Sequence, residues 1–198
     1  SEYGLVAPKE MGQLRAALPC WLEDAENGLS GPFKRLLAGL WTDLQALDDR
    51  VGELDREIAL MARSDPAAKR LQQLHGVGPV VATALIGAVG DGRQFARGRE
   101  MAAVLGLTPR QKSSGGKERL LGISKRGDAY LRTLLIHGAR SAIRHAKGKD
   151  DRLSRWVSAL AARSHPNIAA VALANKTARM AWAILRNDTN YRPDLACV

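Results

Sequence analysis

The chain has 198 residues, which is long enough for one or two domains with a hydrophobic core. With 45% hydrophobic residues and a formal net charge of +10, the composition excludes a disordered chain and favours a polyanionic partner, either nucleic acid or an acidic membrane surface. The positive charge is concentrated in the middle, because residues 92–155 hold 16 Lys and Arg against 5 Asp and Glu, whereas residues 1–91 hold 9 against 13.

The two cysteines and the apolar stretches exclude several other classes. Cys20 and Cys197 lie far apart in the sequence and have no metal-ligand spacing, so we expect ordinary thiols in a reducing compartment. No uninterrupted apolar run reaches the roughly 18 residues of a transmembrane helix, so no transmembrane helix is expected. Among the possible partners we expect no membrane. The first ten residues are too polar for a signal peptide, and because they lack an initial Met we expect a processed or truncated chain.

Residues 1–30 mix short apolar stretches with proline and glycine. We expect a connector in which 13–18 and 21–25 each form about two helical turns.

Residues 31–65 have the most regular hydrophobic pattern of the chain. Apolar residues recur at alternating steps of four and three, which is typical of the a and d positions of a coiled coil. Pro32 suits a first helical turn, and Ser64-Asp65-Pro66 ends the helix. The pattern predicts either one long helix packed on its own domain or a coiled coil, and we favour the coiled coil. Its apolar positions are Phe33, Leu37, Leu40, Leu44, Leu47, Val51, Leu54, Ile58 and Met61.

Residues 71–91 have the pattern of a helix-hairpin-helix. A short helix over 67–74 is followed by the turn Gly76-Val77-Gly78 and by Pro79, which opens an apolar helix. The exposed backbone N–H groups of such a turn, with the partial positive charge of the next helix, bind a DNA phosphate without reading sequence. The alternative is a glycine-turned helical hairpin with no ligand. A dinucleotide-binding G-x-G-x-x-G fingerprint fails because Val81 replaces the third glycine.

Residues 106–128 form a basic, glycine-bearing loop. Ser113 and Ser114 precede Gly115 and Gly116, which permit backbone conformations closed to other residues. Because many cations here are hard to bury without partners, the loop is predicted to hold a phosphodiester. These cations are Arg110, Lys112, Lys117, Arg119, Lys125 and Arg126, and the following helix adds Arg132.

Four further helices are expected over 97–105, 129–143, 153–160 and 167–185. The stretch 122–128 resembles a second, weaker glycine hairpin. No strand is expected anywhere. The predicted fold class is therefore all-α, with a long coiled-coil helix followed by a compact helical domain over 67–190 that contains a helix-hairpin-helix-like DNA-binding element.

The chemistry that the residues themselves support is limited. A serine hydroxyl needs a base or a charged environment to attack phosphorus, and the surrounding cations can stabilise a pentacovalent phosphate. From spacing alone, however, two serines beside glycines are more often turn residues. The isolated Asp91, Glu118 and Asp128 do not make a two-metal nuclease site, and the four histidines have no metal-binding spacing.

Three stretches together resemble a known family. LHGVGPVVATALIGAVGD, GLTPRQKSSGGKERLLGISKRGDAYLRTLLIHGAR and NIAAVALANKTARMAW are similar to the C-terminal part of the "IS one-ten" family of DEDD transposases, to which the Piv-type DNA invertases are related. The resemblance covers roughly residues 71–186.

This resemblance implies a recombinase with two catalytic parts. An N-terminal RuvC-like domain carries four acidic residues that bind Mg²⁺, and a coiled coil joins it to a domain whose serine forms a covalent link to DNA. A structured bridge RNA selects the DNA, and chains assemble through their coiled coils. The RuvC-like domain is not in this sequence, so we expect a fragment that needs no cofactor of its own and is inactive alone, with residues 1–30 as the connector from that domain.

The resemblance also assigns the site residues. The family serine falls on Ser113-Ser114, and Ser114 fits better because it directly precedes Gly115. The glycine hairpin and the cations named above would contact DNA phosphates. We expect a bacterial, cytoplasmic protein that associates with the nucleoid. Two rival hypotheses are a non-catalytic helix-hairpin-helix module that binds the DNA backbone, and a protein that binds only RNA.

Overall fold

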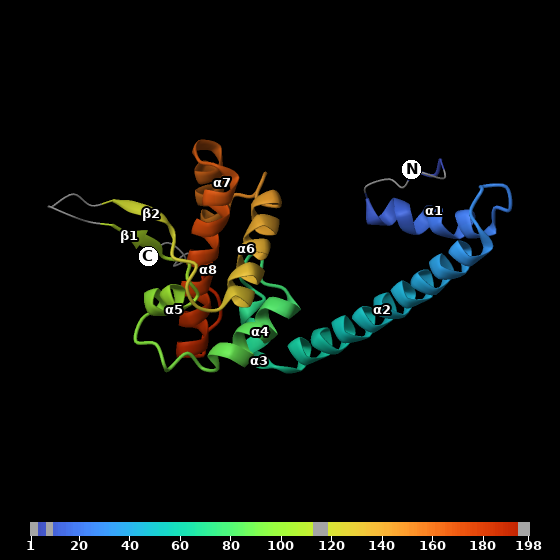
Figure 1. Ribbon diagram of the computed structural model, residues 1–198. Helices are drawn as coiled ribbons and strands as arrows, with labels where there is room; N and C mark the ends of the chain where they lie inside the picture. The colour runs from blue at the N-terminus through green and yellow to red at the C-terminus, as the bar shows by residue number, and fades with distance from the viewer. Residues whose placement is uncertain (1–3, 7–9, 113–118, 194–198) are drawn as a thin grey trace. The chain divides into compact units, whose positions relative to one another are not determined.

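A computed structural model describes residues 4–6, 10–112 and 119–193. The chain divides into two compact units, residues 1–56 and 57–198, and each is described by itself (Figure 1). The described residues form eight α-helices and one two-stranded sheet, which confirms the all-α class. The expectation that no strand is present was wrong, because residues 109–111 and 120–123 pair with each other.

Unit 1 contains helix α1 (Met11–Glu23) and most of helix α2 (Gly31–Ser64). The two short helices expected over 13–18 and 21–25 are one helix that continues through Pro19. Leu18 of α1 is buried, and the apolar face of α1 lines a groove of about 350 Å³ together with the first half of α2. Arg15 and Asp48 form an ion pair at 2.8 Å between the two helices. This packing offsets the hydrogen bond that proline cannot donate within a helix.

Helix α2 runs for 34 residues, and the Ser30 hydroxyl accepts from the N–H of Phe33 at its start. The two halves of its apolar stripe have different surroundings. In the first half, Phe33 lines the groove beside α1, as do neighbouring stripe residues. In the second half, Leu47, Val51 and Leu54 are 61%, 56% and 49% exposed. The long helix predicted from the heptads is therefore present, and its pairing with a second chain stays a prediction.

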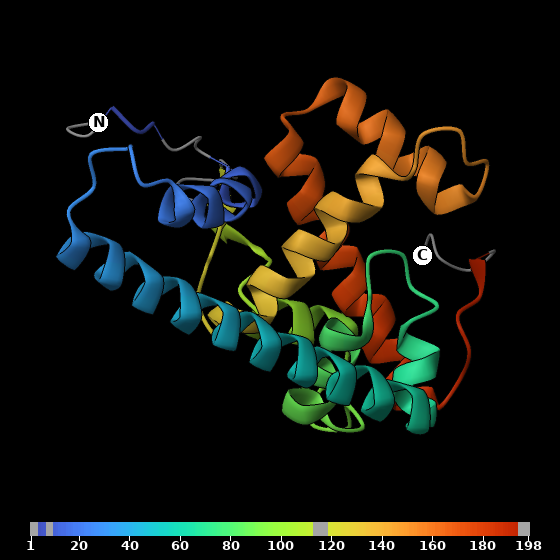
Figure 2. The ribbon, with the colours of Figure 1, turned by 90° about the vertical axis from the view of Figure 1, so that its right-hand side faces the viewer.

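Unit 2 is built around helix α8 (Pro166–Asn187). Helices α3 (Pro66–Leu71), α5 (Gly98–Val104), α6 (Ala129–Arg144) and α7 (Arg152–Arg163) all pack against α8, as Figure 2 shows for α6 and α7. Helix α4 (Pro79–Val89) packs against α3 and α6. The core of this unit holds Leu71, Leu85, Leu135 and Leu173, each at most 1% exposed.

Small residues allow the other helices to approach α8 closely. Ala169, Ala170, Ala174, Ala178 and Ala181 are fully buried along it. By length and composition α8 is also apolar enough to cross a membrane, unlike the expectation from the sequence. Half of its most apolar window is buried inside unit 2, so the apolar character is that of a core helix.

Side chains at the helix starts explain several boundaries. Asp65, Asp128 and Asp151 each precede a helix and accept a hydrogen bond from a backbone N–H in its first turn. His165 does the same for α8, because its Nδ1 accepts from the N–H of Asn167 at 3.2 Å. These caps satisfy N–H groups that have no partner within the helix, so the helix starts are encoded locally.

Candidate nucleic-acid interface

The basic loop of the sequence is held by a short β-hairpin. Strand β1 (Pro109–Gln111) pairs antiparallel with β2 (Leu120–Ile123), with Pro109 opposite Ile123 and a register shift before Gln111. Beyond the strands, the N–H of Lys112 donates to the carbonyl oxygen of Arg119 at 2.9 Å. Lys112 and Arg119 are therefore neighbours across the hairpin, where residues 113–118 begin and end.

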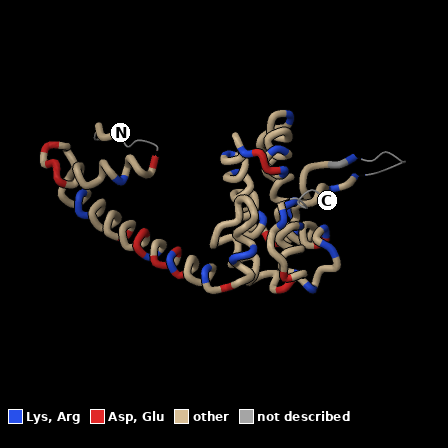
Figure 3. The backbone as a smooth tube through the Cα atoms, turned by 180° about the vertical axis from the view of Figure 1, so that it is seen from behind, with Lys and Arg blue, Asp and Glu red and all other residues tan. Residues whose placement is uncertain are grey.

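The described hairpin is strongly cationic. Arg110, Lys112 and Arg119 are exposed, and Figure 3 shows Lys and Arg at the ends of both strands, whereas many of the acidic residues lie on α2. Like charges gathered on one short element repel each other unless an anion neutralises them. The hairpin therefore presents a surface suited to a phosphate backbone.

A close crossing of two backbone segments forms the base of the hairpin. The N–H of Ser124 donates to Thr108 (2.8 Å), and the N–H of Lys125 donates to Gly106 (3.1 Å). Gly106 and Gly127 have φ of +68° and +84°, and a Cβ on Gly127 would lie 1.7 Å from the carbonyl oxygen of Val104. Only glycine fits there, so the glycines of this region fix where the hairpin leaves the core.

Arg132 reinforces this base from helix α6. Its Nη1 donates to the carbonyl oxygens of Leu105 (3.2 Å), Arg126 (3.4 Å) and Asp128 (3.5 Å), and its side chain is half-buried. The observed contacts of Arg132 are therefore structural, and contact with DNA stays a prediction. Lys125 and Arg126, by contrast, are exposed next to the hairpin base.

The expected second glycine hairpin was wrong. The element before Ser124 is strand β2 and not a helix, so the turn over 124–128 connects a strand to α6. Lys125 takes the left-handed conformation with φ of +56°, which is uncommon for a residue with a Cβ. Of the two glycines in the stretch 122–128, Gly127 serves the close backbone crossing, whereas a Cβ on Gly122 would meet nothing within 4 Å.

The first glycine turn lies between α3 and α4, as expected. Gly76 has φ of +81°, and a Cβ there would stand 2.3 Å from the carbonyl oxygen of Gly138 on α6. Val77 is buried, and its N–H donates to Leu74 at 3.1 Å. Gly78 is the N-cap of α4. The turn therefore packs backbone to backbone on α6, and its use as a phosphate site stays a prediction.

The central residues of the predicted loop fall outside the described part of the chain. These are Ser113, Ser114, Gly115, Gly116 and Lys117. Among the described residues, no three His, Cys, Asp or Glu side chains gather closely enough to hold a metal ion. The serine nucleophile and the role of the glycines beside it therefore stay predictions.

A groove that the sequence does not predict lies beside the hairpin. Its volume is about 880 Å³, and one of its walls is α8, with Asn175, Lys176 and Arg179 in the lining. A signal was present in the sequence: Ile168, Asn175 and Arg179 lie on one face of α8, and two of them are polar. A helix that buries all its faces has no reason to carry such residues.

Comparison with known proteins shows that the chain is similar to transposases. Residues 68–154 match the model of the transposase family described as IS116/IS110/IS902, which includes the IS one-ten elements. A probable family 20 transposase of Pseudomonas aeruginosa is 46% identical over 97% of this chain and 57% of its own length. The transposase for insertion sequence element IS1111A of Coxiella burnetii is 44% identical over 96% of this chain and 52% of its own.

A third, less similar relative is also a transposase. The transposase for insertion sequence element IS1328 of Yersinia enterocolitica is 36% identical over 96% of this chain and 56% of its own length. The chain therefore spans about half the length of the curated relatives that it matches.

Proposed function

Because this chain carries a transposase domain of the IS116/IS110/IS902 family, we propose that it acts in DNA transposition by binding DNA and supplying a serine nucleophile. The observation that carries the proposal is the β1–β2 hairpin. Its exposed cations Arg110, Lys112 and Arg119 flank the segment that contains Ser113 and Ser114. A DNA phosphate attracted to these cations would be brought to the part of the chain that holds both hydroxyls.

The proposed step is a phosphoryl transfer to serine. The Oγ of Ser114 attacks phosphorus, a P–Oγ bond forms, and one P–O bond of the DNA backbone breaks. The serine proton passes through a base to the released oxygen, which leaves as a hydroxyl. Cations of the hairpin stabilise the negative charge that accumulates on the phosphate oxygens. Attack of a second DNA end on the phosphoserine link restores Ser114 and exchanges the strands.

A bound metal ion is not proposed for this chain. The described residues contain no cluster of three metal-ligating side chains, so they do not fit the Mg²⁺ site of the family. We propose that Mg²⁺ belongs to a separate RuvC-like domain with four acidic residues. This assignment makes the active site composite, with the cations and the serine on this chain.

We propose two further partners, a structured guide RNA and a second copy of the chain. The exposed second half of the α2 stripe supports self-association through residues 33–61, because apolar a and d positions at roughly 50–60% exposure bury that surface in a coiled coil. The bacterial origin of the relatives supports a protein that acts in the cytoplasm on nucleoid DNA.

The test uses the full-length parent protein with Mg²⁺, its RNA and a cognate DNA substrate. A covalent protein–DNA adduct is trapped on a denaturing gel, and the linked residue is mapped by mass spectrometry. We expect the adduct at Ser114, its loss in Ser114→Ala, and DNA affinity within about twofold of the parent, since a neutral hydroxyl makes little of the electrostatic binding. The matched control is Ser113→Ala, which should retain the adduct. Cleavage without any adduct would overturn the serine mechanism.

A second candidate function is a non-catalytic module that binds the DNA backbone. The turn between α3 and α4 favours this second function. Gly78 in the turn is the N-cap of helix α4, which begins at Pro79, and helix N-termini attract phosphates. A binding module would retain recombination in Ser114→Ala, which separates this function from the first.

A further inference from the structure

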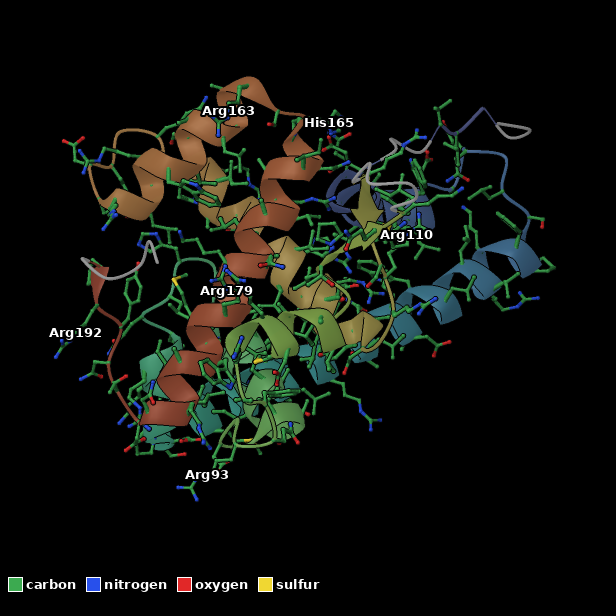
Figure 4. The ribbon with its side chains drawn as sticks, turned by 90° about the vertical axis from the view of Figure 1, so that its left-hand side faces the viewer. Arg93, Arg110, Arg163, His165, Arg179 and Arg192 are labelled. Atoms are coloured by element: carbon green, nitrogen blue, oxygen red, sulfur yellow. The ribbon has the colours of Figure 1, made fainter. Side chains whose placement is uncertain are left out.

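Both walls of the groove beside the hairpin carry cationic side chains. Arg110 and Lys125 contribute from the hairpin and its base, and Lys176 and Arg179 contribute from α8. Figure 4 shows Arg110 on the hairpin and Arg179 on α8. No Asp or Glu is among the described residues that line the groove. Cations on two walls without a carboxylate favour an anion that lies between the walls.

These cations are available for a ligand. Within the described part of the chain, the ion pairs with carboxylates involve Arg15, Arg70, His75 and Arg93, which are elsewhere. Lys176 is held by an aromatic ring and not by a carboxylate. Its Nζ lies 4.7 Å from the ring centroid of Trp156 on α7. A cation–π contact of this kind holds the ammonium group in place and leaves its charge uncompensated.

Apolar side chains line the same groove as the cations. Leu107, Ile123 and Val171 line the groove, and Leu121 and Ile168 are 37% and 60% exposed at the same surface. A DNA duplex presents phosphates on its outside and keeps its base faces stacked inside. An unpaired strand, however, offers both phosphates and base faces. It binds grooves that combine cations with aromatic side chains on which bases stack, and apolar side chains also pack against an exposed base.

We propose that this groove holds an unpaired segment of DNA strand, with phosphates on Arg110, Lys125, Lys176 and Arg179 and base faces on the apolar residues between them. The inference rests on the proposed function, because strand exchange at the hairpin opens a duplex. DNA is chosen as the occupant since the neighbouring hairpin is the proposed site of DNA cleavage. The groove would keep an opened strand beside the hairpin during exchange.

The test measures binding of a fluorescein-labelled single-stranded DNA of mixed sequence, and of the same sequence as a duplex, by fluorescence anisotropy at several salt concentrations. The double variant Lys176→Gln/Arg179→Gln, on the α8 wall of the groove and outside the hairpin, should lower the salt slope for the single strand by about 1.4, because each phosphate contact on a single strand contributes about 0.7. The matched control is Arg93→Gln/Arg192→Gln, which removes the same charge away from the groove (Figure 4) and should leave the slope within about 0.3 of the parent.

A second variant isolates the base contacts. Leu121→Ser/Ile168→Ser changes only exposed side chains, so the fold is retained. It should weaken single-strand binding by about tenfold or more with an unchanged salt slope, because stacking does not depend on counterion release. Duplex binding should stay near that of the parent.

The outcomes separate this inference from the proposed function. If both variants bind the single strand as the parent does, while duplex binding persists, the groove assignment is overturned and the proposed function stands. If no nucleic acid binds, both fail. Two other results also overturn the choice of an unpaired DNA strand. In one, a polyglutamate peptide displaces the single strand as effectively as unlabelled DNA. In the other, a single-stranded RNA binds and single-stranded DNA does not.

Discussion

The Nδ2 of Asn175 on helix α8 donates to the carbonyl oxygen of Leu107 at 3.1 Å, across 68 residues of sequence. Leu107 lies two residues before the hairpin strand and is 1% exposed. One side chain of the central helix therefore fixes the base of the cationic hairpin, and the same residue lines the groove beside it. The hairpin and α8 are held as one structural element by this contact.

Replacing Asn175 should destabilise unit 2. Asn175→Ala leaves the carbonyl group of Leu107 without this donor, and we expect a loss of about 1–2 kcal/mol in the free energy of unfolding, because an unsatisfied buried acceptor is costly. Urea denaturation followed by circular dichroism measures it. The matched control is Asn187→Ala at the exposed end of α8, which should change stability by less than about 0.5 kcal/mol. Equal losses in both variants would contradict the assignment.

The contact between Gly76 and Gly138 should tolerate no side chain. A Cβ on Gly138 would stand 2.0 Å from the carbonyl oxygen of Gly76. Gly138→Ala should therefore cost about 2–3 kcal/mol despite the higher helix propensity of alanine. Gly87→Ala is the matched control, since it lies in helix α4 and a Cβ there would meet nothing within 4 Å, and it should stabilise by about 0.5–1 kcal/mol. The urea midpoints of the two variants, each compared with the parent, measure these stability changes. A change of the same sign in Gly138→Ala and Gly87→Ala would refute the close contact.

The start of α7 should make stability depend on acid pH. Burial acts to raise the pKa of Asp151, but the hydrogen bond from the backbone N–H of Ser154 to its Oδ1 (3.0 Å) and the nearby His75 lower it on balance. A lowered folded pKa means that the stabilisation is complete above the unfolded pKa and is lost as pH falls through the folded pKa. Asp151→Asn should keep the cap without this titration, whereas Asp151→Ala should cost about 1 kcal/mol at neutral pH.

The measurement for Asp151 is the free energy of unfolding as a function of pH. The stability advantage of the parent chain over Asp151→Asn should shrink as pH falls from roughly 5 to 2. A constant difference over this range would show that the carboxylate is not linked to folding.

The exposed half of the α2 stripe should control self-association. Leu47→Glu/Leu54→Glu places charges at two d positions and should convert the oligomer to a monomer, because a charge buried at a coiled-coil seam is unfavourable. Sedimentation equilibrium measures the mass. The control Thr42→Glu/Gln45→Glu adds the same charge outside the apolar stripe and should leave the oligomer intact. A parent chain that is already monomeric at all concentrations would refute the coiled coil.

Much of the fold follows from local sequence signals. The spacing from Phe33 to Met61 predicts the long helix, and Pro66, Pro79 and Pro166 each open a helix in the structure. The all-α class and most helix positions could therefore be derived without tertiary information. The strands of the hairpin could not, because three or four residues that pair across a loop leave no periodicity to detect.

The sequence alone determined the charge distribution, the helical class and the family resemblance carried by residues 106–140, since these depend on residue identity and short-range order. Only the tertiary structure decided that Gly76 serves the contact with Gly138, that Arg132 bonds to backbone carbonyls, and that α8 forms a groove with the hairpin. These relationships join residues far apart in the sequence, or pair a side chain with carbonyl groups. No local pattern encodes them, because they arise only when the helices pack.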